Sequence, residues 1–496
     1  MKKLVLVVID AMKPAMLERA VAAGRAPALK RLMEEGHFIE DCVAAFPSVT
    51  PVCAASIATG TAPDRHQIPS MNWYHRGESR YVEYGTSLAA SRAFGVKRSL
   101  TDTIYNMNLE HLSGDVETVF ETLDDAGVRT AGTTYLMYRG RHRHEAATDT
   151  ALARIATTVF RHAVYGPREF FYADIFASRR TGCRSQLGLP GVRDQHAGCV
   201  GAHLVEHDLF DFLLLSLPDN DTYSHRNGPF AQVSSIAAAD RQIERVMHAA
   251  GGPDAFLEDH AVIVCSDHSQ SLVEHEVDLL RGLDAFGVLP PSGTGEDAQI
   301  ALCPASRSAQ VYVLDRGRRA ELLPRVERTL LGIEGVDLVM RMTGHPDGEA
   351  AILGAGTDDA PRELRFAPRG ELADLRGRRW SLEGDRGVLG LEERDGVLVS
   401  ERYPDALGRV WDALRCRTAG DVLVSAEPGY EFIDWGGAGH VGGGSHGSLH
   451  ANDSHGTLLW CGTGPDAGAR EQWTLRDIVP MVDAHFGLEA QRTSPF

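Results

Sequence analysis

Residues 4–9, LVLVVI, form an apolar run that meets Asp10 abruptly. The same pattern, an apolar run that ends in polar residues, recurs three times: in DFLLLSLP (211–218), AVIVCS (261–266) and TLLWCG (457–462). Runs that are apolar throughout are typical of parallel strands buried on both faces of a sheet. We therefore predict that these four segments are strands of one central parallel sheet.

Helical patterns lie between the predicted strands. They are PALKRLMEEG (27–36), VETVFETLDDAG (116–127) and VSSIAAADRQIERVMHAAGG (233–252). The alternation of strands and helices predicts the α/β fold class, with an open, mostly parallel sheet flanked by helices. Ligands of such sheets bind beyond the carboxyl ends of the strands, so Asp10, Asp219, Asp221 and Asp267 should lie along one edge.

Two stretches interrupt the alternation. Residues 136–205 combine a basic segment, a helical segment and an irregular run, which we interpret as a cap-like insertion over the strand edge. From 285 to 425 the pattern changes to hairpin-like strands with one helix, which predicts a smaller inserted α+β domain. The main core then comprises residues 1–284 and 426–496. A chain of 496 residues is long enough for such a core with its insertions.

The composition excludes several classes of partner. The chain has 50 Lys and Arg against 68 Asp and Glu, a formal net charge of −18, which disfavours binding to a nucleic-acid polymer. No stretch approaches the roughly 20 apolar residues of a membrane span, so we expect no membrane association. The apolar run after the basic start at Met1 is too short for a signal peptide. The eight scattered cysteines form no C-x-x-C pair and predict reduced thiols in a cytoplasmic protein.

A hydroxyl group stands at the predicted start of a helix in FPSVTPVCAASIATG (46–60). Thr50 followed by Pro51 is typical of an N-cap residue and a proline in the first helical position. The positive end of the helix dipole there favours an alkoxide or a phosphate group. The alternative is that Thr50 only caps a core helix.

Asp221 and His225 are four residues apart, a spacing that places both on one face of a helix, within reach of the same ion. Asp219 is a rival carboxylate because it follows its strand directly, but its spacing from His225 does not match one helix face. A solvated polar loop is the alternative interpretation of the pair.

Two further groups of metal-ligand residue types end or follow strands. Asp267 and His268 close a predicted strand, where the chain leaves the pleat and adjacent side chains can converge; a buried Asp–His hydrogen bond is the alternative. The glycine-rich segment GGAGHVGGGSHGSLHANDSHG (436–456) contains four histidines, any of which could reach inward or lie in a surface loop. Three Asp, two or three His and one Thr at one edge suit two sites for zinc or a similar divalent ion. Three carboxylates and an alkoxide would balance the charge of two such ions.

The order of these motifs resembles the alkaline phosphatase superfamily, in particular its type I phosphodiesterase/nucleotide pyrophosphatase branch, which also includes phosphonoacetate hydrolase. The matching segments are VVIDAM (7–12), FPSVTP (46–51) with Thr59-Gly60, PDRH (63–66), NWY (72–74), DTYSHRNGP (221–229), SDHS (266–269) and GSHGS (444–448). They span the whole predicted core in the order of the family.

The resemblance implies two divalent metal ions, Zn²⁺ first and Mn²⁺ or Fe as alternatives, with Thr50 as the nucleophile. It implies one site made of Asp10, Thr50, Asp267 and His268, and a second made of Asp221, His225 and His446. The branch usually has an Asn that holds a phosphoryl oxygen; in this chain Met71 occupies its position and Asn72 follows. The resemblance therefore offers Asn72 as a substitute for that Asn.

The resemblance also implies the activity. The leading hypothesis is a di-metal phosphohydrolase that cleaves a phosphodiester or a nucleotide pyrophosphate bond in a small phosphorylated substrate, through a phospho-threonine intermediate. The alternatives are a phosphonate hydrolase of the phosphonoacetate type, a phosphomonoesterase, and a non-catalytic metal-binding relative. Arg139, Arg141 and Arg143 lie in a basic cluster that either binds an anionic part of the substrate or forms a solvated loop. The oligomeric state is left open.

Overall fold

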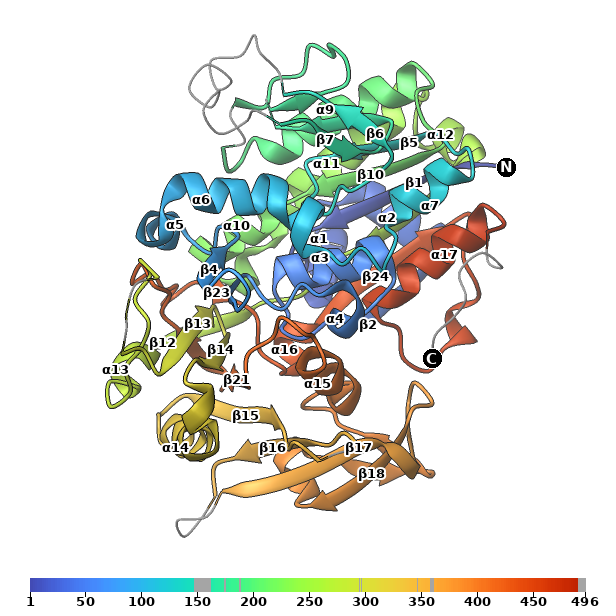
Figure 1. Ribbon diagram of the computed structural model, residues 1–496. Coiled ribbons are helices and arrows are strands. Elements are labelled where there is room, and N and C mark those ends of the chain that lie inside the picture. The colour runs from blue at the N-terminus through green and yellow to red at the C-terminus, as the bar shows by residue number, and fades with distance from the viewer. Residues whose placement is uncertain are drawn as a thin grey trace.

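The computed structural model describes residues 1–146, 162–173, 175–186, 189–293, 295, 297–345, 347–356 and 361–488 (Figure 1). An eight-stranded sheet lies at its centre, in the order β2-β24-β11-β1-β10-β5-β8-β9. Its strands are β1 (Lys3–Ile9), β2 (His37–Val43), β5 (Thr130–Thr133), β8 (Glu169–Tyr172), β9 (Phe176–Ala177), β10 (Phe212–Leu217), β11 (His260–Cys265) and β24 (His455–Cys461). The α/β fold class predicted from the sequence is confirmed.

Three of the four predicted strands, β1, β10 and β11, are parallel as the sequence predicts. Strands β11, β1, β10, β5 and β8 are mutually parallel. Strand β24, predicted to be parallel, runs antiparallel to both β11 and β2. That prediction was wrong because an apolar run reports that a strand is buried, whereas its direction is set by the connection that leads into it.

The side chains of β1 alternate between two helical layers. Leu4, Leu6 and Val8 pack in a core cluster with residues of α3 (Thr50–Thr59), α7 (Val119–Asp125) and α17 (Ile478–His485). The intervening residues of β1 pack in a second cluster with α1 (Pro14–Ala22), α2 (Pro27–Glu35), α9 (Arg193–Glu206), α11 (Val233–Ala249) and α12 (Pro253–Asp259). Both faces of the strand are therefore buried, which explains why its sequence is apolar throughout.

A second, nine-stranded sheet includes most of residues 300–426. Its strands are β13 (Ile300–Ala305), β14 (Ser308–Val313), β15 (Val336–Met342), β16 (Ala350–Gly354), β17 (Arg362–Asp374), β18 (Arg379–Gly384), β19 (Glu392–Arg394), β20 (Val397–Val399) and β21 (Val422–Ala426), with helices α14 (Arg319–Leu331) and α15 (Ala406–Leu414). In Figure 1 this yellow-to-orange sheet lies below the central one. The domain boundaries drawn from the sequence stay predictions.

Smaller elements connect the two sheets and surround the strand edge. The sheet β22-β12-β23 consists of β12 (Ser271–Val277), β22 (Gly429–Phe432) and β23 (Gly444–Ser445). Two hairpins are formed by β3 (Asn72–His75) with β4 (Arg80–Glu83) and by β6 (His142–His144) with β7 (Val164–Gly166). Among the described residues, the remaining short α-helices are α4 (Pro63–His66), α5 (Leu88–Phe94), α6 (Val96–Thr101), α10 (Asp219–Asn227), α13 (Leu279–Gly282) and α16 (Ala451–Ser454), and a π-helix spans Asp102–His111.

Much of the predicted cap-like insertion at 136–205 belongs to the core. Strand β8 pairs with β5 in the central sheet, and α9 packs against the same sheet. The sequence prediction missed this because β8, with the sequence EFFY, is too short to give a periodic signal. Residues 147–161, 174 and 187–188 of this stretch lie outside the described residues.

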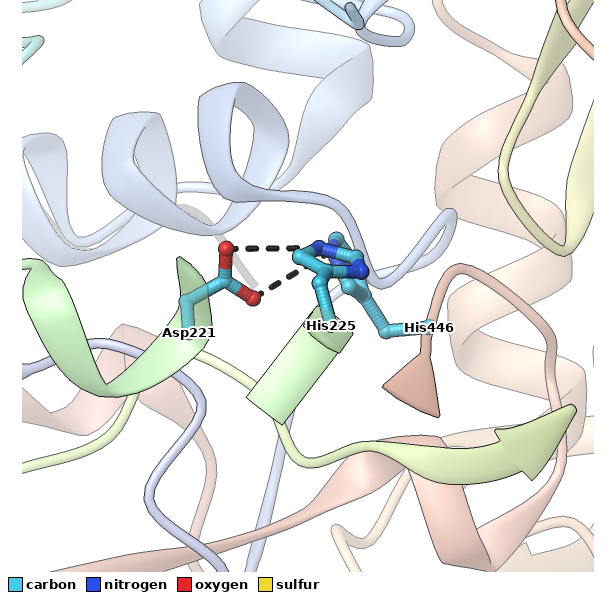
Figure 2. Close-up of side chains that lie close together, drawn as sticks. All are labelled: Asp221, His225 and His446. Carbon is cyan, nitrogen blue, oxygen red and sulfur yellow. Dashed lines mark ion pairs between the residues drawn. The ribbon is translucent and has the colours of Figure 1, made fainter. Parts of the chain in front are cut away.

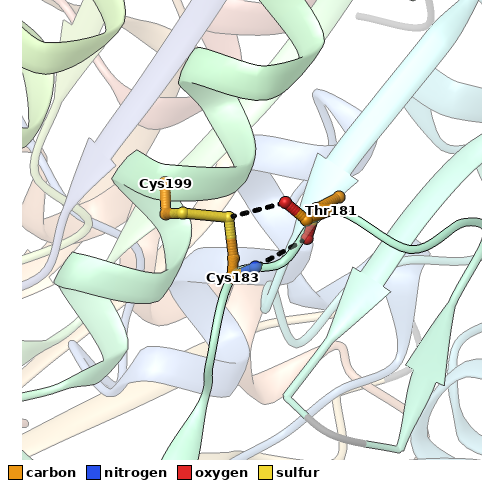
Figure 3. The surroundings of a disulfide bond; sticks show 3 residues. All are labelled: Thr181, Cys183 and Cys199. Atoms are coloured by element: carbon orange, nitrogen blue, oxygen red, sulfur yellow. Dashed lines mark hydrogen bonds between the residues drawn. A yellow bond between two sulfur atoms is a disulfide. The ribbon is translucent and has the colours of Figure 1, made fainter.

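The prediction of reduced thiols is wrong for two of the eight cysteines, since Cys183 and Cys199 form a disulfide (Figure 3). It joins the irregular segment before α9 to the middle of that helix, and the main-chain N–H of Cys183 donates to Thr181 Oγ1. No local pattern indicates this disulfide, because the pairing depends on how the segment folds back onto the helix. Disulfides persist in oxidising surroundings, so the predicted cytoplasmic location loses its basis. The other six cysteines are free and buried.

Within the described residues, every helix is too short or too polar to cross a membrane.

Candidate active site

The first cluster of polar residues lies where β1 and β11 end. These neighbouring parallel strands pair up to Val8 and Cys265, and Asp10 and Asp267 each follow two residues later. Their carboxylates therefore meet at the same edge of the sheet. His268 lies between them: its Nε2 is 3.6 Å from Asp10 Oδ1 and 3.5 Å from Asp267 Oδ2.

The second cluster contains Asp221, His225 and His446 (Figure 2). Asp221 and His225 are four residues apart on α10, as the sequence predicts, and Asp221 Oδ2 is 3.3 Å from His225 Nε2. His446 follows β23, and its Nε2 is 3.7 Å from Asp221 Oδ1. In each cluster the possible ligand atoms lie within 4.8 Å of one another, close enough to hold a single ion.

The two clusters form one centre. The rings of His268 and His446 stack with their centroids 3.8 Å apart, so the two clusters are in direct contact. The carboxylate of Asp221 also acts on the charge of Asp10 across the gap. The structure thus brings together all six Asp and His residues that the sequence assigned to two metal sites.

The three histidines present the same ring nitrogen to the carboxylates. In each, Nδ1 lies within hydrogen-bond distance of a main-chain carbonyl oxygen: Gly444 for His225 at 2.8 Å, Ser269 for His268 at 3.1 Å, and Ser48 for His446 at 2.8 Å. A carbonyl oxygen only accepts, so Nδ1 must carry the proton and donate. Whenever such a ring is neutral, its lone pair is on Nε2, which faces the carboxylates. This arrangement is characteristic of histidines that bind metals.

Without a bound cation, ionisation of the carboxylates in the first cluster is disfavoured. Burial, followed by the charges of Asp267 and Asp221, raises the pKa of Asp10 well above its usual value. Burial also raises the pKa of Asp267 to about 6. Asp10 Oδ1 is buried and accepts no hydrogen bond from the described residues. A divalent cation would supply the missing partner, so the donor set fits a metal ion.

In the second cluster, the attraction between opposite charges exceeds the cost of burying them. Burial disfavours both charges, but the pair of Asp221 and His225 outweighs it: the pKa of His225 rises to about 9, and that of Asp221 falls well below its usual value. Burial lowers the pKa of His446 to about 3, which keeps that ring neutral. A carboxylate and two imidazole nitrogens are ligands that suit zinc, and manganese or iron less specifically.

Thr50 contributes a hydroxyl group to the first cluster. Its Oγ1 lies 3.2 Å from His268 Nε2. Helix α3 begins at Thr50, the N-cap is Val49, and no side chain caps the helix. The predicted N-cap role was therefore wrong by one residue, because the extended backbone of Val49 precedes the first turn. The hydroxyl is free for chemistry at the positive end of the helix.

The side chain of Asn72 makes its hydrogen bonds with residues outside the two metal-ligand clusters. It is buried, and its amide donates to the carbonyl oxygen of Pro304 at 2.5 Å, in β13 of the second sheet. Met71, which occupies the family's usual Asn position, packs against the hydrophobic core. The role of Asn72 in holding a phosphoryl oxygen stays a prediction, and its observed contacts give it a structural function.

The arginine cluster lies outside the two metal-ligand clusters, and its charges are already paired. Arg139 Nε contacts Glu121 at 3.0 Å, and its other nitrogens donate to main-chain carbonyls. Arg141 pairs with Glu121 and with Asp125. Arg143 pairs with its near neighbour Glu145 at 2.5 Å. The predicted substrate-binding role loses its support, because carboxylates of the chain occupy these guanidinium groups.

The rival candidates of the sequence analysis point away from the centre. Asp219 accepts from Arg193 Nε at 2.8 Å and so faces α9. His440 donates from Nδ1 to Glu431. The centroid of its ring lies 4.3 Å from that of His225, so it packs against the second cluster. His450 caps α16, and His455 begins β24.

Two buried residues near the centre escaped the sequence analysis. Gln270 Nε2 donates to Asp221 Oδ1 at 2.5 Å, and its position two residues after His268 could have suggested it. Asp453 accepts from Ser271 Oγ at 2.5 Å and from the main-chain N–H of Ser448 at 2.9 Å. It thereby joins the segments that follow His268 and His446, a role with no signal in its local sequence.

Comparisons with known proteins agree with this geometry. The family model of the type I phosphodiesterases/nucleotide pyrophosphatases matches residues 4–342. No curated protein matches significantly.

Solved structures resemble the chain over almost its full length. The murine ectonucleotide pyrophosphatase/phosphodiesterase 5 has 13% identity and a TM-score of 0.57, covering 100% of this chain and 96% of its own. An inactive variant of that protein bound to AMP gives 12% identity and a TM-score of 0.58, with the same coverage. Phosphonoacetate hydrolase from Sinorhizobium meliloti, bound to phosphonoformate, has 17% identity and a TM-score of 0.52, covering 96% of this chain and 93% of its own. At these identities the likeness establishes the fold.

Proposed function

Because the chain belongs to the type I phosphodiesterase/nucleotide pyrophosphatase family, we propose that it is a metal-dependent hydrolase of phosphodiester or nucleotide pyrophosphate bonds, with Thr50 as its nucleophile. The observation that carries the proposal is the convergence of three histidine Nε2 atoms and three carboxylates beside the Thr50 hydroxyl. It is the one hydroxyl of this set, and the carboxylates and imidazoles around it are grouped as metal-ligand types, which leaves Thr50 as the proposed nucleophile.

The ligand sets proposed for two divalent cations are Asp10, Thr50, Asp267 and His268 for one, and Asp221, His225 and His446 for the other. Zinc is the first candidate. Cations bound there would increase the acidity of the hydroxyl and neutralise charge on the phosphoryl oxygens.

The chain's own residues provide the rest of the reaction. Thr50 Oγ1 loses its proton and forms a bond to phosphorus while the bond to the leaving oxygen breaks. The leaving oxygen takes up a proton, which gives a phospho-threonine and a free alcohol or phosphate. The positive end of α3 favours the developing negative charge at Thr50. Attack by water on the same phosphorus then releases the phosphomonoester and restores the Thr50 hydroxyl.

Hydrolysis of chromogenic esters tests this proposal. The substrates are bis-p-nitrophenyl phosphate, p-nitrophenyl thymidine monophosphate and p-nitrophenyl phosphate, with phosphonoacetate as a fourth. We expect the two diesters to be hydrolysed fastest, activity to disappear with a chelator, and added zinc or manganese to restore it. Preference for phosphonoacetate would favour a phosphonate hydrolase instead. Failure of the metal-replete protein to cleave any of the four would contradict the proposal.

A further inference from the structure

A cavity of about 650 Å³ lies among helices α9, α10 and α11. On α10 it is lined by Asp219, Thr222, Tyr223 and Arg226, which share one face of the helix because they are spaced by three or four residues. Asp221 and His225 are absent from its lining. The cavity therefore opens on the side of α10 opposite the candidate active site.

Three guanidinium groups line this cavity without partners. Arg226 comes from α10, and Arg241 and Arg245 are one turn apart on α11. All three are exposed, and none has an ion pair or hydrogen bond to a described residue. Two like charges at this helical spacing repel each other, so an anion between them would stabilise the pair.

Neighbouring carboxylates have other contacts, although the charge of Arg241 also acts on Asp240. On α11, Asp240 accepts from the main-chain N–H of Leu29, and Glu244 lies 3.7 Å from His248 Nε2. On the cavity wall, Asp219 is paired with Arg193 at 2.8 Å.

The last carboxyl of the wall belongs to Asp194, which accepts from the main-chain N–H of Asp219 at 2.9 Å. Burial raises its pKa to about 7, which reduces its negative charge at neutral pH. The lining is thus positively charged, in a chain whose net charge is −18.

The remaining lining is polar and of a size that suits a small organic molecule. Hydroxyl and amide groups of Gln195, Thr222, Tyr223, Asn227 and Gln242 surround the arginines. The volume falls within the range of about 300–1,000 Å³ typical of small-molecule sites. Arginine forks match the oxygens of phosphate, and the hydroxyl and amide groups match a hydroxylated body such as a sugar.

We propose that this cavity binds a phosphomonoester with a polar body, such as a nucleoside monophosphate, at a site separate from the Thr50 centre. The presence of an anion site follows from the cavity and its arginines. The choice of a phosphomonoester rests on the proposed function, since cleavage of a nucleotide diester releases one.

Calorimetric titration of the full-length protein with AMP tests the proposal. We expect two AMP molecules to bind each metal-replete chain. A chelator should remove the site at the candidate metal centre and leave the second. The double variant Arg241→Ala/Arg245→Ala should weaken the second site at least tenfold. The control Arg25→Ala/Arg281→Ala makes the same change in net charge at exposed arginines outside the cavity, and should leave both sites unchanged.

Two results would overturn the proposal: binding of a single AMP that the chelator abolishes, or equal weakening in both double variants. A parallel titration with inorganic phosphate measures how much the organic part of AMP contributes to binding. Equal affinity for phosphate and AMP would overturn the phosphomonoester assignment. The proposed AMP site and the proposed hydrolase activity can each be rejected without the other. Arginine-dependent AMP binding in a protein that hydrolyses no ester would retain this site and reject only the catalytic proposal.

Discussion

The Thr50 hydroxyl illustrates how much of this site depends on single atoms. A threonine at the start of a helix ordinarily caps it, and the sequence cannot distinguish capping from catalysis. In the structure the first turn begins at Thr50 itself, so the hydroxyl contacts His268 instead of a main-chain N–H. A shift of one residue in the helix start thus decides between the two roles.

Substitution of Thr50 separates these roles. Thr50→Ala should reduce kcat for the preferred diester by at least about 1,000-fold, because it removes the attacking oxygen. The metal content measured by elemental analysis should fall little, since the other six ligands remain. Thr50→Ser, which keeps a hydroxyl, is the matched control and should retain measurable turnover. Rates like those of the wild type in Thr50→Ala would refute the assignment of the nucleophile.

Asp221 and Asp219 offer a second test at this scale, since they lie two residues apart on α10 and face opposite sides. Asp221→Asn should lower the bound metal from two ions to one per chain and reduce activity by at least about 100-fold. Asp219→Asn should leave the metal stoichiometry at two, because Asp219 pairs with Arg193. Elemental analysis after dialysis measures both. Loss of the same ion in both variants would remove Asp221 from the ligand set.

At the scale of elements, helix α2 depends on a residue of another helix. Its N-cap residue, Ala26, has no side chain able to cap it. The carboxylate of Asp240, on α11, accepts from the main-chain N–H groups of Ala28 at 3.3 Å and Leu29 at 2.8 Å. The cap is therefore supplied through tertiary packing.

Removal of this cap should destabilise the protein. We expect Asp240→Ala to lower the free energy of unfolding by about 1–2 kcal/mol, the usual value of a helix cap. Asp254→Ala is a suitable control, because this exposed carboxylate makes only a surface ion pair with Arg31 and should cost less than about 1 kcal/mol. Urea unfolding measures both, and equal losses would argue against capping by Asp240.

The Asp240 carboxyl also makes the stability of the protein depend on pH. Burial raises the pKa of Asp240 to about 6, from 3.8 in the unfolded chain. The folded state thus prefers the protonated form, and this contribution is complete below about pH 4 and is lost as the pH rises to about 6. Relative to the wild type, Asp240→Asn should gain stability across this interval, by at most about 3 kcal/mol. A difference between the two proteins that is constant from pH 4 to 6 would contradict the shift.

At the scale of the whole molecule, the second sheet supports the candidate active site. The turn between β13 and β14 contains Arg307, whose main-chain N–H donates to the carbonyl oxygen of His446 at 2.8 Å. The guanidinium group of Arg307 is fully buried, with Nε 3.4 Å from Asp453 Oδ2. Asp453 in turn holds the segments after His268 and His446. Residues from distant parts of the chain therefore fix both clusters.

This linkage predicts a combined effect on stability and metal binding. Asp453→Asn should destabilise the fold by about 3–5 kcal/mol, since it leaves the buried Arg307 without its counter-charge. It should also weaken zinc binding in the folded protein. Asp412→Asn, which breaks a buried pairing with Arg378 and Arg476 that includes no ligand residue, should reduce stability and leave zinc affinity unchanged. Unchanged zinc affinity in Asp453→Asn would restrict Asp453 to a structural role.

Four strands of the central sheet, several flanking helices and some of the metal-ligand candidates could be predicted from the sequence, because apolar runs, helical spacing and strand ends are local patterns. The choice of His446 among the four histidines of 436–456 came from the resemblance to the family. Asp221 with His225, and Asp267 with His268, are close in sequence and could be recognised without the fold. The direction of β24, the place of β8 in the core and the Cys183–Cys199 disulfide depended on connections that no local pattern records.

Three other features follow from the packed structure alone: which ring nitrogens face the carboxylates, the pairing of the arginines at 139–143 with carboxylates, and the link that Asp453 makes between the two ligand segments. Each of these facts is a contact between residues far apart in the chain. Such contacts are fixed by the packing of whole layers, so their energies appear only once the core has formed around them.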